Sequence, residues 1–99
     1  MFCRSYTDFF QALANKTNQQ IIEVLLRKEM NVSEIVEATT LEQSKVSHSL
    51  KKLAECSFVN IKKKGKQRIY SLNKETIIPI LKIADSHAKQ MCPICTKVH

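Results

Sequence analysis

The only glycine of this 99-residue chain, Gly65, stands between two short segments that have the composition of β-strands. Residues 58–62 and 67–72 predict the two strands of a β-hairpin, and residues 63–66 predict its turn. The chain has two prolines besides this glycine, and it contains no repeated or low-complexity stretch that would indicate a linker. We therefore expect residues 1–99 to form a single domain that carries one hairpin.

Apolar residues at helical spacing predict helices on both sides of the hairpin. The predicted helices cover the segments 6–14, 17–28, a short segment from Ser33, 42–56 and 76–91. The polar residues expected to cap them are Ser5 with Asp8, Thr17 with Gln20, and Ser33. The fold class is therefore expected to be mainly α, with about five helices and one two-stranded β-hairpin.

Segment 42–56 predicts a helix that is apolar on one narrow side only. Val46, Leu50 and Leu53 follow one another at positions i, i+4 and i+7, so they lie on one helical face. The other faces carry polar and basic side chains, namely Gln43, Ser44, Lys45, Ser47, His48, Lys51 and Lys52. We expect this helix to pack through its apolar stripe and to present the polar face outward.

The formal net charge of +7 is concentrated in the middle of the chain. Residues 42–70 contain eight basic and two acidic side chains, whereas residues 1–41 contain four and five, and residues 71–99 contain four and two. Such an excess on one helix and the adjoining hairpin is typical of a surface that binds a polyanion. A basic run can also be a solvated face, an interpretation that suits charges on unrelated elements.

A short helix, a tight turn, a helix with a polar outer face and a basic hairpin occur in the order of a winged helix-turn-helix. The helix-turn-helix covers about residues 33–56 and the wing about 58–72. The predicted partner is double-stranded DNA. The side chains expected to meet base edges or phosphates are Gln43, Ser44, Lys45, Ser47, His48 and Lys51, of which His48 could instead be solvated. Those expected along the backbone or the adjacent minor groove are Lys62, Lys63, Lys64, Lys66 and Arg68.

Residues 9–72 resemble the ArsR/SmtB group of winged-helix repressors. The stretch FFQALANKTNQQIIEVLL resembles the opening of that family, LEQSKVSHSLKKLAECSFV its recognition helix and following strand, and KKKGKQRIYSL its wing. The resemblance implies a transcriptional repressor that binds an imperfect palindrome as a homodimer through its first and last helices, and that leaves DNA when it senses a metal ion or another signal. The last helix, about 76–91, fits a dimerisation role because its apolar stripe exceeds what a domain of this size needs to cover. That stripe consists of Ile77, Ile80, Leu81, Ala84, Ala88 and Met91.

The chain departs from the pattern of that family at two structural positions. Lys16 stands where a proline is usual before the second helix, and Thr40 stands where a glycine is common in the turn of the helix pair. A threonine at positive φ would cost roughly 1–2 kcal/mol. We therefore expect this turn to be built differently from the turn of the family.

The two best-known sensing sites of that family are incomplete in this chain. Asn31 and Ser33 stand where arsenic and cadmium sensors carry paired thiols. Lys74 and Thr76 stand where zinc sensors carry an acidic residue and a histidine, which leaves His87 alone on the last helix. We therefore expect any sensing to use other residues.

The C-terminal sequence Cys92-Pro-Ile-Cys95, followed by His99, has a spacing suited to two thiolates and an imidazole on one metal ion. Zinc or another thiophilic metal is the expected cofactor, with Cys3 or His87 as the fourth ligand. Cys92 and Cys95 could instead close as a disulfide and act as a redox switch, could hold a purely structural zinc, or could be incidental thiols. The remaining cysteine, Cys56, is expected to be a small buried hydrophobe.

Other function classes have little support in the sequence. There is no Gly-rich phosphate loop, no paired carboxylates in a cleft pattern and no Ser-His-Asp set with its supporting motifs, so we do not expect an enzyme. No run of about 18 apolar residues and no signal-peptide pattern is present, so we expect a cytoplasmic protein without a membrane partner. The alternative is a winged-helix protein-interaction module without effector sensing, although such a module would carry a more dilute basic charge.

Overall fold

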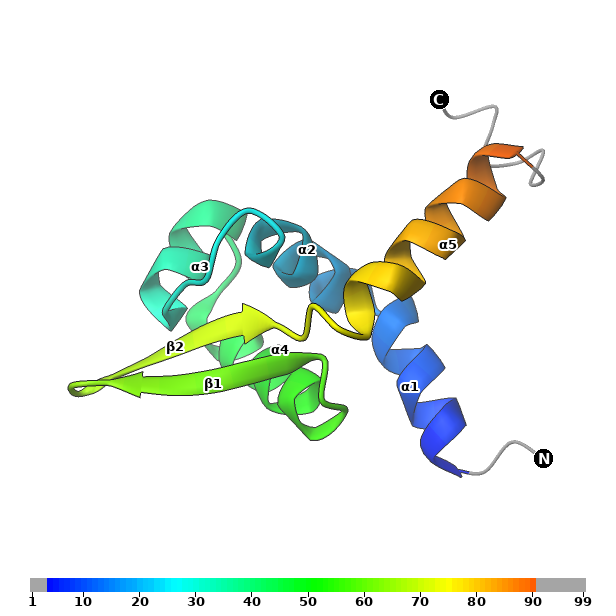
Figure 1. Ribbon diagram of the computed structural model, residues 1–99. Helices are drawn as coiled ribbons and strands as arrows, with labels where there is room; N and C mark the ends of the chain where they lie inside the picture. Colours follow the sequence, from blue (N-terminus) through cyan, green and yellow to red (C-terminus); the bar gives the residue numbers. More distant parts are fainter. Residues whose placement is uncertain (1–3, 91–99) are drawn as a thin grey trace.

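The computed structural model describes residues 4–90, which form five helices and one antiparallel hairpin (Figure 1). The helices are α1 (Arg4–Ala14), α2 (Lys16–Leu25), α3 (Val32–Thr39), α4 (Gln43–Glu55) and α5 (Ile77–Gln90), and the strands are β1 (Val59–Lys64) and β2 (Gln67–Leu72). This architecture confirms the expected fold class. Within the described residues, no helix combines the length and apolar composition needed to cross a membrane.

The core lies where α2, α3 and α4 pack together and the base of the hairpin closes against them. Val46, Leu50 and Leu53 of α4 are at most 1% exposed, which confirms the predicted apolar stripe. Helix α2 is buried on much of its circumference, through Asn18, Ile21, Ile22, Val24 and Leu25. The side chains in the core with the least exposure are Phe58, Ile21, Ile35, Leu50, Leu53, Ile77 and Val46.

The helices begin at other residues than the cap pairs predict. Asn15 caps α2 by accepting a hydrogen bond from the backbone N–H of Asn18 at 3.0 Å, so Thr17 lies inside the helix. Asn31 caps α3 through a capping box with Glu34, in which each side chain accepts from the backbone N–H of the other residue. Ser5 lies inside α1 and not at its N-cap. Asparagine is as good an N-cap as serine and better than threonine, and the asparagines two positions earlier cap both helices instead.

The turn between α3 and α4 contains a left-handed residue, Thr40, so the expectation that this turn is built without positive φ is wrong. Thr40 has φ 60° and ψ 17°, so the turn is built with positive φ although no glycine is present. Three hydrogen bonds hold it: Thr40 N–H to Val36 O at 2.8 Å, Thr39 Oγ1–H to Ile35 O at 2.7 Å, and Leu41 N–H to Thr39 Oγ1 at 3.3 Å. These bonds offset the roughly 1–2 kcal/mol that the left-handed conformation costs.

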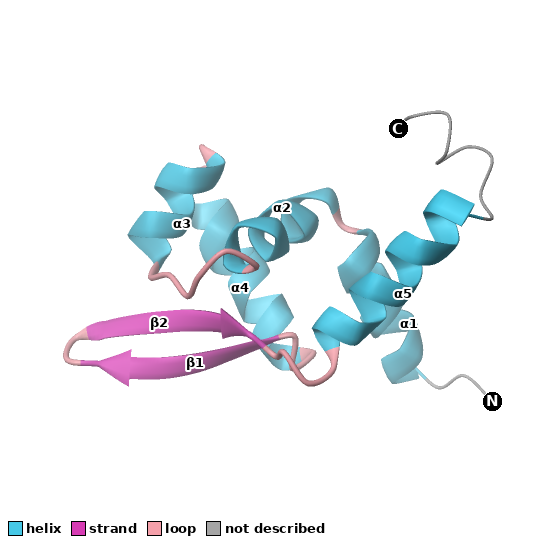
Figure 2. Cartoon of the chain, turned by 45° about the horizontal axis from the view of Figure 1, so that its top comes forward, coloured by secondary structure: helices cyan, strands magenta, loops and turns pink. Residues whose placement is uncertain are grey.

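The hairpin forms the wing and extends beyond α3 in both views of the chain (Figures 1 and 2). Its turn consists of Gly65 and Lys66 only, because Lys64 pairs with Gln67, and it is therefore two residues shorter than predicted. Gly65 has φ +66° in the first turn position, as a type II′ turn requires. A Cβ on Gly65 would meet no atom within 4 Å, so backbone conformation and not space explains the glycine.

The end of α4 leads directly into the wing through a Schellman motif. Ser57 has φ 61° and donates its backbone N–H to Ala54 O at 3.0 Å, and Phe58 donates to Leu53 O at 2.8 Å. The two residues that this motif brings together, Phe58 and Leu53, are both almost completely buried. A residue in the left-handed region therefore sets the angle between α4 and β1.

We predict that Ser57→Gly stabilises the protein by about 0.5–1 kcal/mol. Glycine removes the left-handed strain of roughly 1–2 kcal/mol but adds entropy to the unfolded chain, which offsets part of the gain. Urea denaturation measures the free energy of unfolding. The matched control, Ser47→Gly in the right-handed interior of α4, should destabilise the protein by about 0.5 kcal/mol. A loss of stability in Ser57→Gly would contradict the role assigned to this residue.

Candidate nucleic-acid interface

Helix α4 presents a polar face because its apolar face is fully used in the core. Val46, Ser49, Leu50 and Leu53 are buried against α2 and α3, so the intervening positions point outward. The exposed side chains include every predicted contact on this helix, namely Gln43, Ser44, Lys45, Ser47, His48 and Lys51. The face is rich in amide, hydroxyl and amine groups, which are suited to base edges and phosphates.

The strand register divides the predicted cations of the wing between two faces. Lys63 pairs with Arg68 and projects to the same face as Val59 and Tyr70, because side chains alternate along a strand. Lys62 and Lys64 project to the opposite face. Lys66 lies in the turn. All five predicted cations of the wing are exposed: Lys62, Lys63, Lys64, Lys66 and Arg68.

Lys63 and Arg68 place like charges directly opposite each other in the ladder. Such a cross-strand pair destabilises a hairpin, whereas opposite charges stabilise it. Among residues 4–90, the only ion pair within 4.0 Å joins Asp85 and Lys89 on α5, so no carboxylate described by the structure neutralises these cations. The wing and α4 thus retain positive charge that is available to an external anion.

Backbone hydrogen bonds close the base of the wing and attach it to the helical part of the fold. Met30, in the loop after α2, exchanges two bonds with Tyr70 of β2, at 3.0 and 2.8 Å. Asn73 donates its backbone N–H to Phe58 O at 2.9 Å, and Phe58 donates to Leu53 O of α4. Nothing in the sequence indicates these contacts of Met30 and Asn73, because a single bridge between distant segments leaves no periodic pattern. The base of the wing therefore has a defined position relative to α4.

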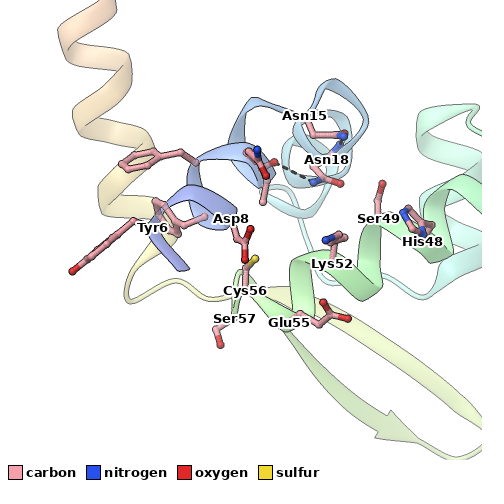
Figure 3. Close-up of a pocket in the computed structure, with 14 residues that line it drawn as sticks. Tyr6, Asp8, Asn15, Asn18, His48, Ser49, Lys52, Glu55, Cys56 and Ser57 are labelled. Atoms are coloured by element: carbon pink, nitrogen blue, oxygen red, sulfur yellow. Dashed lines mark hydrogen bonds between the residues drawn. The ribbon is translucent and has the colours of Figure 1, made fainter. Parts of the chain in front are cut away.

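A hollow of about 970 Å³ lies between α1, the start of α2 and the side of α4 (Figure 3). His48 and Lys52 of α4 line it, so His48 stands at the border between the outward face and this hollow. Asn18, which is buried, donates its side-chain N–H to Ala12 O at 3.1 Å and so joins α1 to α2.

Four of the predicted metal or redox residues, Cys92, Cys95, His99 and Cys3, lie outside the described residues, so the structure does not test this prediction. Cys56 packs against the core but is only half-buried, so it is less enclosed than the small buried hydrophobe that we expected. His87 is exposed on α5. In the part of the chain that the structure describes, no three His, Cys, Asp or Glu side chains are grouped so that they could hold a metal ion.

Comparisons with known proteins agree with this architecture. Residues 15–60 match the family model described as bacterial regulatory protein, arsR family. A probable mercury resistance operon repressor of Streptomyces lividans is 30% identical over 95 residues, which cover 91% of this chain and 74% of that protein. The structure of Rv0081 from Mycobacterium tuberculosis is similar, with a TM-score of 0.81, 25% identity, and coverage of 95% of this chain and 93% of that chain.

A third similar protein is Mb0332 from Mycobacterium bovis. Its solved fragment is described as a homodimeric winged helix-turn-helix DNA-binding domain and a possible ArsR-family transcriptional regulator. The TM-score is 0.79 at 23% identity, with coverage of 88% of this chain and 82% of that chain. At this level of identity the likeness shows the shared fold.

We predict that Arg68→Glu stabilises the free protein by about 0.5 kcal/mol, because it replaces a repulsive cross-strand pair with an attractive one opposite Lys63. Urea denaturation at low salt measures the change. Lys66→Glu is the matched control, since it changes the net charge equally but lies in the turn without a cross-strand partner. An equal gain in both variants would show that overall charge, and not the Lys63–Arg68 pair, is responsible.

Proposed function

This chain belongs to the ArsR family of bacterial regulatory proteins, and we propose that it represses transcription by binding a palindromic operator as a homodimer. It is a regulatory protein and not an enzyme, as the family consists of regulators. The observation that carries the proposal is the exposed polar face of α4 beside a wing whose cations have no described carboxylate partner. A winged-helix module that binds only proteins would be expected to carry a more dilute basic charge on this helix and wing.

In the proposed complex, α4 enters the major groove and its N-terminal half reads base edges. Gln43 and Ser47 are one turn apart on the exposed face, so they can contact neighbouring base pairs. Ser44, Lys45, His48 and Lys51 flank them and meet base edges or phosphates. The wing cations contact the phosphate backbone or the adjacent minor groove, where they add affinity through counterion release.

The proposed dimer forms through α1 and α5, which lie at the end of the molecule opposite the wing tip (Figure 1). Large apolar side chains are exposed on both helices: Tyr6 at 48%, Phe10 at 56% and Ile83 at 71%. Burial of these side chains in a partner subunit would remove apolar area from water. The homodimeric state described for Mb0332 supports a dimer. Two recognition helices would then lie in successive major grooves, about one helical turn apart.

We further propose that a thiophilic metal ion, with zinc as the default, or thiol oxidation regulates DNA binding through Cys92 and Cys95. Thiolates and an imidazole are the ligand types that zinc prefers, so Cys92, Cys95 and His99 suit it, with Cys3 or His87 as a fourth ligand. The name of the Streptomyces lividans relative, a probable mercury resistance operon repressor, supports a thiophilic metal. A disulfide between Cys92 and Cys95 is the redox form of the same proposal.

We predict that selection from randomised duplexes yields an inverted repeat with half-site centres about 10–10.5 base pairs apart. Replacing Lys63, Lys64 and Arg68 together with Ala should weaken binding to all duplexes and lower the slope of log affinity against log salt concentration by about three. Gln43→Ala or Ser47→Ala should instead reduce discrimination between the selected site and mismatched sites, by about 1–2 kcal/mol at the positions read.

Gel-shift titrations at several salt concentrations measure both effects. Lys74→Ala is the control, because Lys74 is exposed and lies outside α4, the wing and the two proposed dimer helices. Unchanged affinity in the triple variant would remove the wing from the interface, and failure to select any duplex would favour the alternative of a protein-interaction module.

We predict that zinc or an oxidant, titrated into the protein–DNA complex, changes the affinity by 1–3 kcal/mol, the usual size of an allosteric coupling. The variant with Cys92→Ser and Cys95→Ser should show no such change, whereas Cys56→Ala should respond like the wild type. Fluorescence anisotropy with labelled operator measures the coupling. Identical responses in the wild type and the double variant would exclude the pair as the sensor.

A further inference from the structure

Asn31 makes contacts with two elements that are far apart in the sequence. Its Oδ1 accepts a hydrogen bond from the backbone N–H of Glu34 at 2.8 Å and so caps α3. Its Nδ2 donates to the side-chain Oε1 of Gln67 on β2 at 3.3 Å. The two functions use different atoms of one amide, so the same side chain joins the first helix of the helix-turn-helix to the wing.

The contact with Gln67 lies beyond the last backbone attachment of the wing. Met30 and Tyr70 form the only bridge between the loop after α2 and β2 among the described residues. Gln67 is three residues closer to the turn than Tyr70, about 10 Å along the strand. The part of the hairpin beyond the Ile61–Tyr70 pair carries all the predicted phosphate contacts of the wing, namely Lys62, Lys63, Lys64, Lys66 and Arg68.

A two-stranded hairpin is at best marginally stable without packing on one face. Beyond the Ile61–Tyr70 pair the side chains of the wing are exposed, apart from the half-buried Ile69. The like charges of Lys63 and Arg68 weaken this part further. The bond from Asn31 reaches Gln67, the first residue of β2 after the turn, directly across the ladder from Lys64.

We infer that Asn31 is a positioning residue for DNA binding, which holds the outer half of the wing at a set angle to α4 through Gln67. The inference rests on the proposed contact between wing and DNA. Asn31 does not touch the DNA itself. It lowers the entropy that the wing cations lose on binding, because the hairpin is already held where the phosphates lie.

Two substitutions separate the hydrogen bond between Asn31 and Gln67, here called the tether, from the N-cap that Asn31 provides for α3. Asn31→Ser keeps a good N-cap for α3 but is too short to reach Gln67. Gln67→Met keeps the length of the side chain and removes the acceptor oxygen. Gln20→Met, at an exposed position on α2, is the matched control. Gln67→Glu preserves the acceptor and makes the bond charge-assisted, so it should rescue the tether in the free protein.

The first readout is the ¹⁵N backbone order parameter of Gly65 and Lys66 in the free protein. We expect it to fall from about 0.85 towards 0.6 in Asn31→Ser and in Gln67→Met, and to keep its wild-type value in Gln20→Met and Gln67→Glu. The double variant with Asn31→Ser and Gln67→Met should be no more mobile than either single variant, because both remove the same bond. Unchanged order parameters in the single variants, or additive changes in the double variant, would overturn the inference.

The second readout is affinity for the selected duplex across salt concentrations. Asn31→Ser and Gln67→Met should each bind about threefold more weakly, the effect of one lost hydrogen bond, with an unchanged salt slope because the wing cations still contact the same phosphates. The midpoint of thermal unfolding should stay within about 4 °C of the wild type, which separates positioning from general destabilisation. Wild-type affinity in both variants would overturn the inference. If the wild type binds no duplex, the proposed function fails, and the order parameters alone decide whether the tether exists.

Discussion

Helix α4 is held in place by three apolar side chains, Val46, Leu50 and Leu53, that lie in the core with almost no exposure. Because α4 has only this one narrow apolar face, its burial determines which side chains α4 can present to a partner. It also determines where β1 begins, since Phe58 packs at the end of the same stripe. The position of the polar face and the origin of the wing are therefore consequences of one packing interaction.

In the free protein, the surface made by α4 and the wing is destabilised by electrostatic repulsion and by backbone strain. Like charges face each other across the ladder at Lys63 and Arg68, and two residues adopt left-handed backbone conformations, Thr40 at the end of α3 and Ser57 just after α4. Hydrogen bonds around each turn offset the backbone strain. The electrostatic repulsion has no such offset among the described residues, and an anionic duplex is the partner that would remove it.

Asn31 makes two hydrogen bonds, of which only one could be predicted from the sequence. The resemblance to the ArsR/SmtB group marks it only as a substitution for a thiol. The structure gives it two hydrogen bonds, one local to Glu34 and one across 36 residues to Gln67. The local bond could have been predicted, because an asparagine followed three residues later by a glutamate is a capping signal. The distant bond could not, because it depends on the Met30–Tyr70 bridge that brings the two segments together.

The sequence by itself determined the helical segments, the hairpin at Gly65, the apolar stripe of α4 and the concentration of basic charge between residues 42 and 70. These properties depend on neighbours within a few positions, so their periodicity and composition are visible in the chain. Only the tertiary structure decided that Lys63 and Arg68 share one face, that Thr40 and Ser57 are left-handed, and that Asn31 meets Gln67. Each of these depends on register or on contacts between distant segments, which follow from packing the whole chain and not from any local preference.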